Sequence, residues 1–290
     1  MVNTVPNAHL RATVEAFKSP LRYPGGKQKA IKQISPMLPK SAFEYREPMV
    51  GGGSVFFHVR SIGFAKSYWI NDEFEELVSF LKTVKNKTKC KMLMQDLEEL
   101  RRDFDSADDV KKFYHLARKE EPTDKYRQAL LFFFFNRVTF SGTTRAGGFS
   151  SQASIKRFTR SSIERLDKLP EAMQDTRITH GDFQNVIQAP GEDVFLFLDP
   201  PYFTAKKLYG RDGKLHEFDH ERLADLLKNT PHRFLITYDN CQEIRDLYTW
   251  AHLKSKNEID ISQWSLQYGM NNCGLDKSSK LGEELFIKNY

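Results

Sequence analysis

A run of five apolar residues, Val194–Leu198, ends just before two consecutive prolines. An unbroken apolar run of this length is typical of a parallel strand that is buried on both faces of a sheet. Pro200 and Pro201 cannot donate hydrogen bonds to a sheet ladder, so the strand has to stop near Asp199. The pattern therefore predicts an open α/β sheet, in which Asp199 lies just beyond the carboxyl end of a strand. Ligands bind at that edge in such sheets.

A glycine turn earlier in the chain predicts a nucleotide-like ligand. A strand, three glycines, a helix and a second strand follow one another at residues 43–50, 51–53, 55–60 and 67–70. Glycines at such a turn let the backbone approach a ligand closely, because no side chain stands in the way. Asp72 follows about 20 residues later, where nucleotide-binding folds accept hydrogen bonds from ribose hydroxyls, although it could also cap a helix. S-adenosylmethionine suits this unit, whereas the G-x-G-x-x-G pattern of a nicotinamide cofactor is missing.

The alternation of strands and helices stops after residue 84 and resumes near residue 171. Amphipathic helices are expected between these points at 92–104, 110–119 and 125–135, followed by a Gly/Ser/Thr-rich stretch at 141–154 and a helix that ends at Leu169. Residues 81–170 contain 20 Lys and Arg against 12 Asp and Glu, so they carry the whole excess of the formal net charge of +6. This distribution favours a nucleic-acid partner over the alternative of a solvated helix surface. We expect a sheet domain split by a basic insert at residues 85–170.

The last third of the chain returns to the α/β pattern. Strands are expected at 177–179, 194–198, 233–237 and 284–289, with helices at 221–228 and 242–248. Asp182 and Phe183 follow the first of these strands, either as ligand-binding residues at the same sheet edge or as a simple turn. An acid, a proline carbonyl and a flat ring, as in Asp199–Tyr202, suit a grip on the exocyclic amine of a planar base.

Several classes of protein are excluded by composition. No apolar stretch approaches the roughly 20 residues that a membrane span needs, and residues 1–20 lack the pattern of a secretion signal. Three widely spaced cysteines, Cys90, Cys241 and Cys273, predict neither a disulfide framework nor a metal cluster and fit a reducing cytoplasm. The sequence at Lys27 lacks the Ser/Thr of a phosphate loop, so we expect Lys27 to bind a ligand carboxylate.

Six segments in order resemble the Dam-like, alpha-group DNA adenine N6-methyltransferases. They are RYPGGK at 22–27, EPMVGGGS at 47–54, ND at 71–72, NRVTFSG at 136–142, DPPY at 199–202 and EELFIKN at 283–289. DPPY-like tetrads occur in other amino-methylating enzymes, but this order with a basic insert is specific. The resemblance implies a Rossmann-like class I S-adenosylmethionine-dependent methyltransferase domain at 1–84 and 171–290, with a mostly helical DNA-recognition domain at 85–170. It implies methyl transfer to N6 of adenine in duplex DNA after base flipping.

The resemblance also implies roles for individual residues. Asp199, Pro200 and Tyr202 would be catalytic, with Tyr202 stacked on the flipped base. The cofactor would be bound by Tyr23, Lys27, Glu47, Gly51, Gly52, Gly53, Asp72, Asp182, Phe183 and Asp199. DNA would be bound by Arg137, Arg145, Lys156 and Arg157, and Arg145 has the position from which some relatives read a guanine. No metal is expected.

The target sequence and the biological context stay open at this point. Residues 146–150 differ from the usual GATC-reading sequence, and Met49 replaces a common aromatic or aliphatic residue. The same tetrad would also serve an RNA or protein amino-methyltransferase, and a DNA-binding relative without catalysis is a further alternative. The role could belong to restriction–modification, to a phage or to regulation. We expect a protein of the bacterial or phage-infected cytoplasm, associated with the nucleoid. Action as a monomer is compatible with the sequence, which leaves the oligomeric state open.

Overall fold

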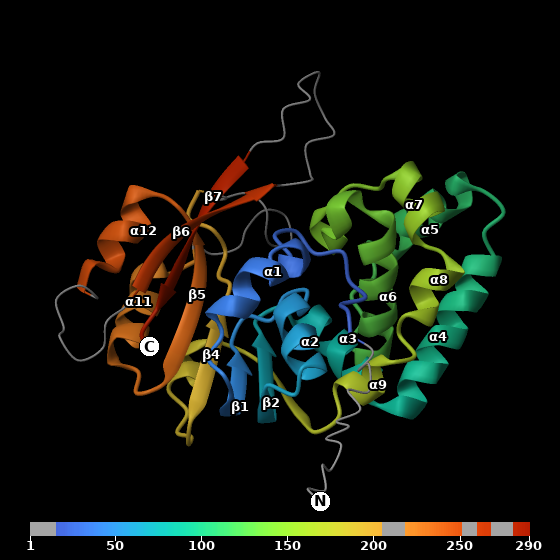
Figure 1. The fold of residues 1–290 in the computed structure, drawn as a ribbon. Helices are drawn as coiled ribbons and strands as arrows, with labels where there is room; N and C mark the ends of the chain where they lie inside the picture. Colours follow the sequence, from blue (N-terminus) through green and yellow to red (C-terminus); the bar gives the residue numbers. More distant parts are fainter. Residues whose placement is uncertain (1–15, 205–217, 251–259, 268–280) are drawn as a thin grey trace, which may run out of the picture.

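A seven-stranded sheet with the strand order β3-β2-β1-β4-β5-β7-β6 forms the centre of the protein (Figure 1). The computed structural model describes residues 16–204, 218–250, 260–267 and 281–290. The strands are β1 Ala42–Glu47, β2 Ala65–Asp72, β3 Thr176–His180, β4 Val194–Leu198, β5 Arg233–Asp239, β6 Asp260–Gln267 and β7 Leu281–Lys288. The first five pair in parallel, and β7 pairs antiparallel with both β5 and β6. The expected Rossmann-like α/β sheet is confirmed.

Alternate residues of the central strands point into two different apolar cores. Phe195 and Phe197 of β4 share one core with α2 (Ser54–Ser61) and α3 (Glu75–Lys85). Leu196 and Leu198 share the other with the helices α10 Gln184–Ile187, α11 His220–Asn229 and α12 Gln242–Leu247. A strand enclosed on both faces can be apolar at every position, which explains the unbroken run in β4.

The helical region in the middle of the chain extends the first core. Its helix α6 (Lys125–Val138) is buried from Gln128 to its end, and the rings of Phe132 and Phe133 lie 5.4 and 5.7 Å from that of Phe80 in α3. The expectation of an amphipathic helix here was wrong, because α6 is enclosed on all sides. The mostly helical character of this region is confirmed, but the proposed domain boundaries at 85 and 170 stay a prediction.

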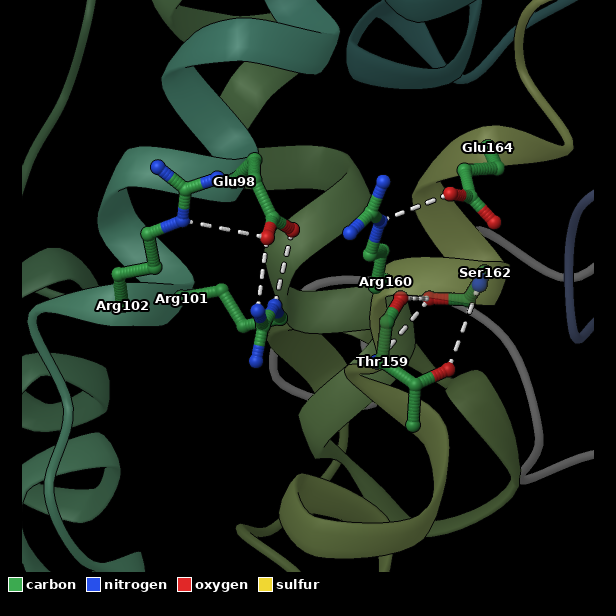
Figure 2. Close-up of polar contacts among 7 residues, drawn as sticks. All are labelled: Glu98, Arg101, Arg102, Thr159, Arg160, Ser162 and Glu164. Atoms are coloured by element: carbon green, nitrogen blue, oxygen red, sulfur yellow. Dashed lines mark hydrogen bonds and ion pairs between the residues drawn. The ribbon is translucent and has the colours of Figure 1, made fainter.

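The remaining helices of this region gather beyond the β2 side of the sheet in Figure 1. They are α4 Lys87–Arg102, α5 Ala107–Ala117, α7 Ser151–Arg157, α8 Arg160–Glu164 and α9 Leu169–Ala172, with 3-10 turns at Phe140–Gly142 and Thr144–Ala146. The single helix expected up to Leu169 is therefore two short ones. Thr159 caps the first of them and exchanges hydrogen bonds with Ser162, which Figure 2 shows.

Other differences from the sequence pattern are local. The segment before β1 contains 3-10 turns at Lys27–Lys29 and Ser35–Met37 on either side of the short helix α1, Ile31–Ile34. The strand β6 was not expected from the sequence. No helix of the described segments is long and apolar enough to cross a membrane. Cys90 and Cys241 are free thiols, while Cys273 and residues 1–15 lie outside the described residues.

Candidate active site

The carboxyl ends of five parallel strands meet at one edge of the sheet, and each end carries polar residues. In spatial order they are Asp182 after β3, Asp72 in β2, Glu47 in β1, Asp199 after β4, and Thr237 and Asp239 in β5. The strand order thus brings residues from distant parts of the chain into one row. The carboxylates that the sequence predicted as site residues all lie along this row.

Asp199 is held by two donors that share one of its oxygens. The ammonium of Lys27 lies 2.6 Å from Asp199 Oδ1, and the Thr237 hydroxyl donates to the same oxygen at 2.8 Å. Lys27 is only 3% exposed, and its Nζ lies 4.8 Å from the centre of the Tyr202 ring. The sequence suggested a ligand carboxylate as the partner of Lys27, whereas the structure gives it the Asp199 carboxylate.

The glycine turn is fixed to both Tyr23 and Asp72. A Cβ atom at Gly51 or Gly52 would lie 2.9 or 2.7 Å from side-chain atoms of Tyr23, so a side chain at either position would displace the tyrosine. Asp72 Oδ2 accepts the Gly51 amide at 2.8 Å, and its Oδ1 accepts the Phe74 amide at 2.9 Å. The structure therefore brings together Tyr23, the glycine turn and Asp72, which are three parts of the predicted cofactor site.

Glu47 is a buried acid close to two other carboxyl groups. The Tyr45 hydroxyl donates to Glu47 Oε2 at 2.7 Å. Burial raises the pKa of Glu47 well above its ordinary value; the hydrogen bond from Tyr45 opposes this shift, and the charges of Asp199 and Asp72 add to it. Burial also raises the pKa of Asp72, against the effect of its two amide donors. An enclosed group of acids of this kind favours a cationic ligand.

Asp182 and Phe183 form the other end of the row. Asp182 Oδ1 accepts the Gln184 amide at 2.7 Å, and Oδ2 pairs with Arg222 Nη2 at 2.8 Å. The Arg222 guanidinium lies 4.5 Å from the centre of the buried Phe183 ring. Sequence reasoning missed Arg222, which α11 brings over both residues.

Asp239 holds the segment that follows the DPPY tetrad. Its Oδ1 accepts the Phe203 amide at 3.0 Å, while Oδ2 accepts the amide and the hydroxyl of Thr204 at 2.9 and 2.7 Å. Sequence reasoning gave no role to Asp239 or Thr237. The available signal was the appearance of polar residues directly after the apolar run 234–236, at the same sheet edge as Asp199.

Arg145 does not lie where a DNA-reading side chain would have to lie. It is 4% exposed, its Nε lies 2.9 Å from Glu76 Oε1, and its Nη1 donates to the carbonyls of Ala117 and Arg118 at 3.4 and 3.1 Å. The structure therefore does not present the Arg145 guanidinium at the surface, and its contact with DNA stays a prediction. Instead, the side chain joins α3 to the carboxyl end of α5.

Arg137 is also buried, at 2% exposure, and its role in DNA binding stays a prediction. It donates to the Pro20 carbonyl and lies over the Phe133 ring. Burial lowers the pKa of Arg137 to about 9, and the charges of Arg22, Arg165 and Arg157 contribute. Arg137 thus belongs to a cationic cluster at the junction between α6 and the N-terminal segment.

Asn136 attaches that same N-terminal segment to α6. Its Oδ1 accepts the Arg22 amide at 3.1 Å, and its Nδ2 donates to the Arg22 carbonyl at 2.6 Å. Tyr23 and Lys27 follow within five residues. The amide of Asn136 therefore helps to place two residues of the candidate site.

The expected DNA-binding residues Lys156 and Arg157 are exposed at the end of α7. Three other arginines of the helical region form ion pairs with acids on their own helices. Figure 2 shows Arg101 and Arg102 on Glu98 of α4, and Arg160 on Glu164 of α8, and each of these pairs has an N–O distance of 3.4 Å or less. Such surface pairs add little stability, but they reduce the positive potential of that face.

A family model supplies the comparison that decides the class of protein. The model of the D12 class N6 adenine-specific DNA methyltransferases matches residues 23–260, which include the glycine turn, Asp72 and the DPPY tetrad. The chain belongs to this family. Membership of the D12 class confirms the expected Dam-like family and the expected class of enzyme.

Individual relatives agree with the D12 assignment. The type II methyltransferase M.MjaIII of Methanocaldococcus jannaschii is 29% identical over 206 residues, which cover 64% of this chain and 70% of its own. The DNA N-6-adenine-methyltransferase of Escherichia phage P1 is 28% identical over 249 residues, 82% of this chain and 32% of its own. The modification methylase StsI of Streptococcus sanguinis is 24% identical, over 98% of this chain and 44% of its own. The matches thus span less than half of the two longer relatives.

Proposed function

We propose that this protein transfers the methyl group of S-adenosylmethionine to the exocyclic N6 amine of adenine in duplex DNA. The observation that carries the proposal is the Asp199 carboxylate, fixed at the carboxyl end of β4 by Lys27 and Thr237 and followed by Pro200 and Tyr202. Membership of the D12 class supports the reaction. The names of the relatives, which include phage and modification methylases, make restriction–modification or phage DNA modification the natural context.

The residues at the sheet edge fit S-adenosylmethionine. Its sulfonium and ammonium groups are cationic, and the site offers the enclosed carboxyl groups of Glu47 and Asp72. The glycine turn with Tyr23 would hold the methionine and ribose side, and Asp182 with Phe183 would hold the adenine. When bound, the cofactor supplies an electrophilic methyl group, a chemistry that the protein side chains lack.

The acceptor amine has to be activated by position. Its lone pair is delocalised into the adenine ring, so it is a weak nucleophile. The Asp199 carboxylate and the Pro200 carbonyl would each accept a hydrogen bond from one N–H group of this amine. These two hydrogen bonds would draw the nitrogen toward tetrahedral geometry and direct its lone pair at the methyl group. Positioning and fixed dipoles then provide most of the acceleration. Tyr202 would stack on the base, which leaves the duplex at a cost of a few kcal/mol.

The surface that we propose for DNA includes Lys156 and Arg157. Burial lowers the pKa of Arg22, and the charge of the nearby Arg157 lowers it further. The Arg22 guanidinium donates to the Thr139 carbonyl at 3.2 Å, next to the segment that carries Tyr23. The mutual repulsion of neighbouring cations is relieved when a polyanion binds between them, so phosphate groups suit this surface. A protein with this substrate would work at the nucleoid in the cytoplasm.

The test is modification-sensitive sequencing of DNA from methylation-free bacteria that express the protein, with Asp199→Ala as the matched control. N6-methyladenine in one short motif, absent with Asp199→Ala, is the expected result and also identifies the target sequence. Calorimetry should show that Asp199→Ala still binds S-adenosylmethionine. If the DNA carries no methyl mark and the purified enzyme methylates RNA or protein, then RNA or protein is the acceptor and DNA is not. Near-normal turnover of Asp199→Ala would remove Asp199 from the mechanism.

A further inference from the structure

We propose that Thr237 is a positioning residue for methyl transfer, which orients the Asp199 carboxylate so that its Oδ2 accepts the target amine. The inference rests on the proposed function. It assigns a role to a side chain of β5, a strand outside the glycine turn, the DPPY tetrad and the N-terminal segment. The catalytic group itself remains Asp199.

The first step of the argument is the occupancy of the two carboxylate oxygens. Lys27 Nζ and Thr237 Oγ1 both contact Oδ1, at 2.6 and 2.8 Å. An ionised carboxylate has about four lone-pair sites, two on each oxygen, so these two donors saturate Oδ1. Among the residues that the structure describes, no donor contacts Oδ2. The oxygen left for an incoming N–H is therefore Oδ2.

The second step is the difference between the two donors. The Lys27 ammonium is buried and also donates to the Gly25 carbonyl at 3.1 Å, so its position is fixed. It is nevertheless a compact point charge with rotatable donors, which compensates the negative charge but restrains the plane of the carboxylate only weakly. The terminal torsion of an aspartate is broad, so one point charge leaves the carboxylate free to turn. Thr237 is β-branched, which restricts its χ1 angle, and its residue is fully buried. Its hydroxyl therefore gives the direction that the lysine lacks.

The third step is the rigidity of the strand that carries the hydroxyl. Ile236 pairs with Leu198 in the parallel ladder between β5 and β4, which places Thr237 beside Asp199. On the other side of β5, Thr237 pairs with Phe286 of β7. The β7 ladder thus holds the Thr237 backbone directly, and the β4 ladder ends one residue before it. Asp239, two residues further on, holds the amides of Phe203 and Thr204. The carboxylate and the segment after the tetrad are aligned by the same strand.

The experiment compares Thr237→Val, which keeps the shape and removes the hydroxyl, with Thr237→Ser, which keeps the hydroxyl. Single-turnover methylation of a duplex that contains the target motif gives the rate, and calorimetry and fluorescence anisotropy give the affinities for S-adenosylmethionine and for the duplex. We expect a rate about 10- to 100-fold lower for Thr237→Val, the size of a small misplacement of reacting groups. Both affinities should stay within about 2-fold, because positioning acts on the transition state. Thr237→Ser should recover most of the rate.

Several outcomes would overturn the proposal. Thr237→Val could turn over at the wild-type rate, or Thr237→Ser could fall as far as Thr237→Val, which would assign the effect to the lost methyl group. A loss of affinity at an unchanged rate would give Thr237 a merely structural role. If Thr237→Val does not fold, Thr237→Ala removes the same hydroxyl with less crowding. A wild-type enzyme that methylates no adenine would refute the proposed function itself, and wild-type turnover is measured first to separate the two.

Discussion

Replacing Arg145 by methionine should lower the stability of the protein and leave the DNA sequence that it recognises unchanged. The reason is the environment of the guanidinium, which is enclosed between Glu76 of α3, the last carbonyls of α5 and the Phe135 ring 5.0 Å away. Methionine fills part of the volume but removes the charge and every donor. The contacts of the guanidinium with α3 and with the carboxyl end of α5 would then be lost.

The magnitude follows from these contacts. Breaking a buried ion pair by removal of one partner costs about 3–5 kcal/mol. The Glu76 side chain is 16% exposed, so water can partly replace the arginine, and we take the lower end of that range. A loss of about 3 kcal/mol corresponds to a fall in Tm of about 5 °C for a chain of 290 residues.

Thermal and urea unfolding of the purified variant measure this loss. Arg157→Met is the matched control, because Arg157 is exposed and its replacement should change stability by about 0.5 kcal/mol or less. Adding Glu76→Gln to Arg145→Met should restore part of the stability, since it removes the charge that has lost its arginine partner. An Arg145→Met protein as stable as the wild type, but with a relaxed target motif, would refute this reasoning and restore Arg145 as a base reader.

Two further predictions concern the acid group and the DNA surface. Because the pKa of Glu47 is raised in the folded protein, the folded protein keeps a proton that the unfolded chain has lost above about pH 4.3. The contribution of Glu47 to stability therefore falls by about 1.4 kcal/mol for each unit of rising pH, until the folded-state pKa is reached. Glu47→Gln should therefore gain stability relative to the wild type between pH 5 and 7 in urea unfolding; a constant difference would contradict the assignment. Replacing Lys156 and Arg157 by alanine should reduce the slope of log K for DNA against log salt by about 2, whereas the paired Arg101 and Arg102 should change it little. Equal slopes for both double variants would move the DNA surface elsewhere.

The sequence predicted best those features that depend on neighbouring residues. The bounds of β4 match the expected strand, because an unbroken apolar run and two prolines determine both its burial and its end. The strand β1 ends at Glu47, just before Pro48, which cannot continue the ladder. Among the acids at this sheet edge, the same logic covers Asp199, which comes directly after the apolar run of β4. Glu47 and Asp72 are instead the last residues of β1 and β2, and Asp182 lies two residues beyond the end of β3.

What the sequence could not show depends on partners far away in the chain. In the sequence, Arg145 looks like a DNA-reading residue because it lies in a basic segment. In the structure its guanidinium pairs with Glu76, which lies 69 residues earlier in the chain. A basic residue in a basic segment gives no sign of whether its partner is a phosphate or a buried acid. The full burial of α6 was hidden for a related reason, because only the packing of α3 against it shows that both of its faces are covered.

The position of β4 between β1 and β5 explains why one carboxylate can receive support from both directions. Asp199 meets Lys27, which precedes β1 in the chain, and Thr237, which lies in β5. Of these two donors, the Thr237 hydroxyl is held by a strand of the sheet, whereas Lys27 comes from a 3-10 turn that precedes β1. Charge compensation and orientation therefore come from different residues, and a change at one should leave the other in place. Because both donors contact Asp199 Oδ1, a double-variant comparison of Lys27 and Thr237 measures how strongly the two contributions are coupled.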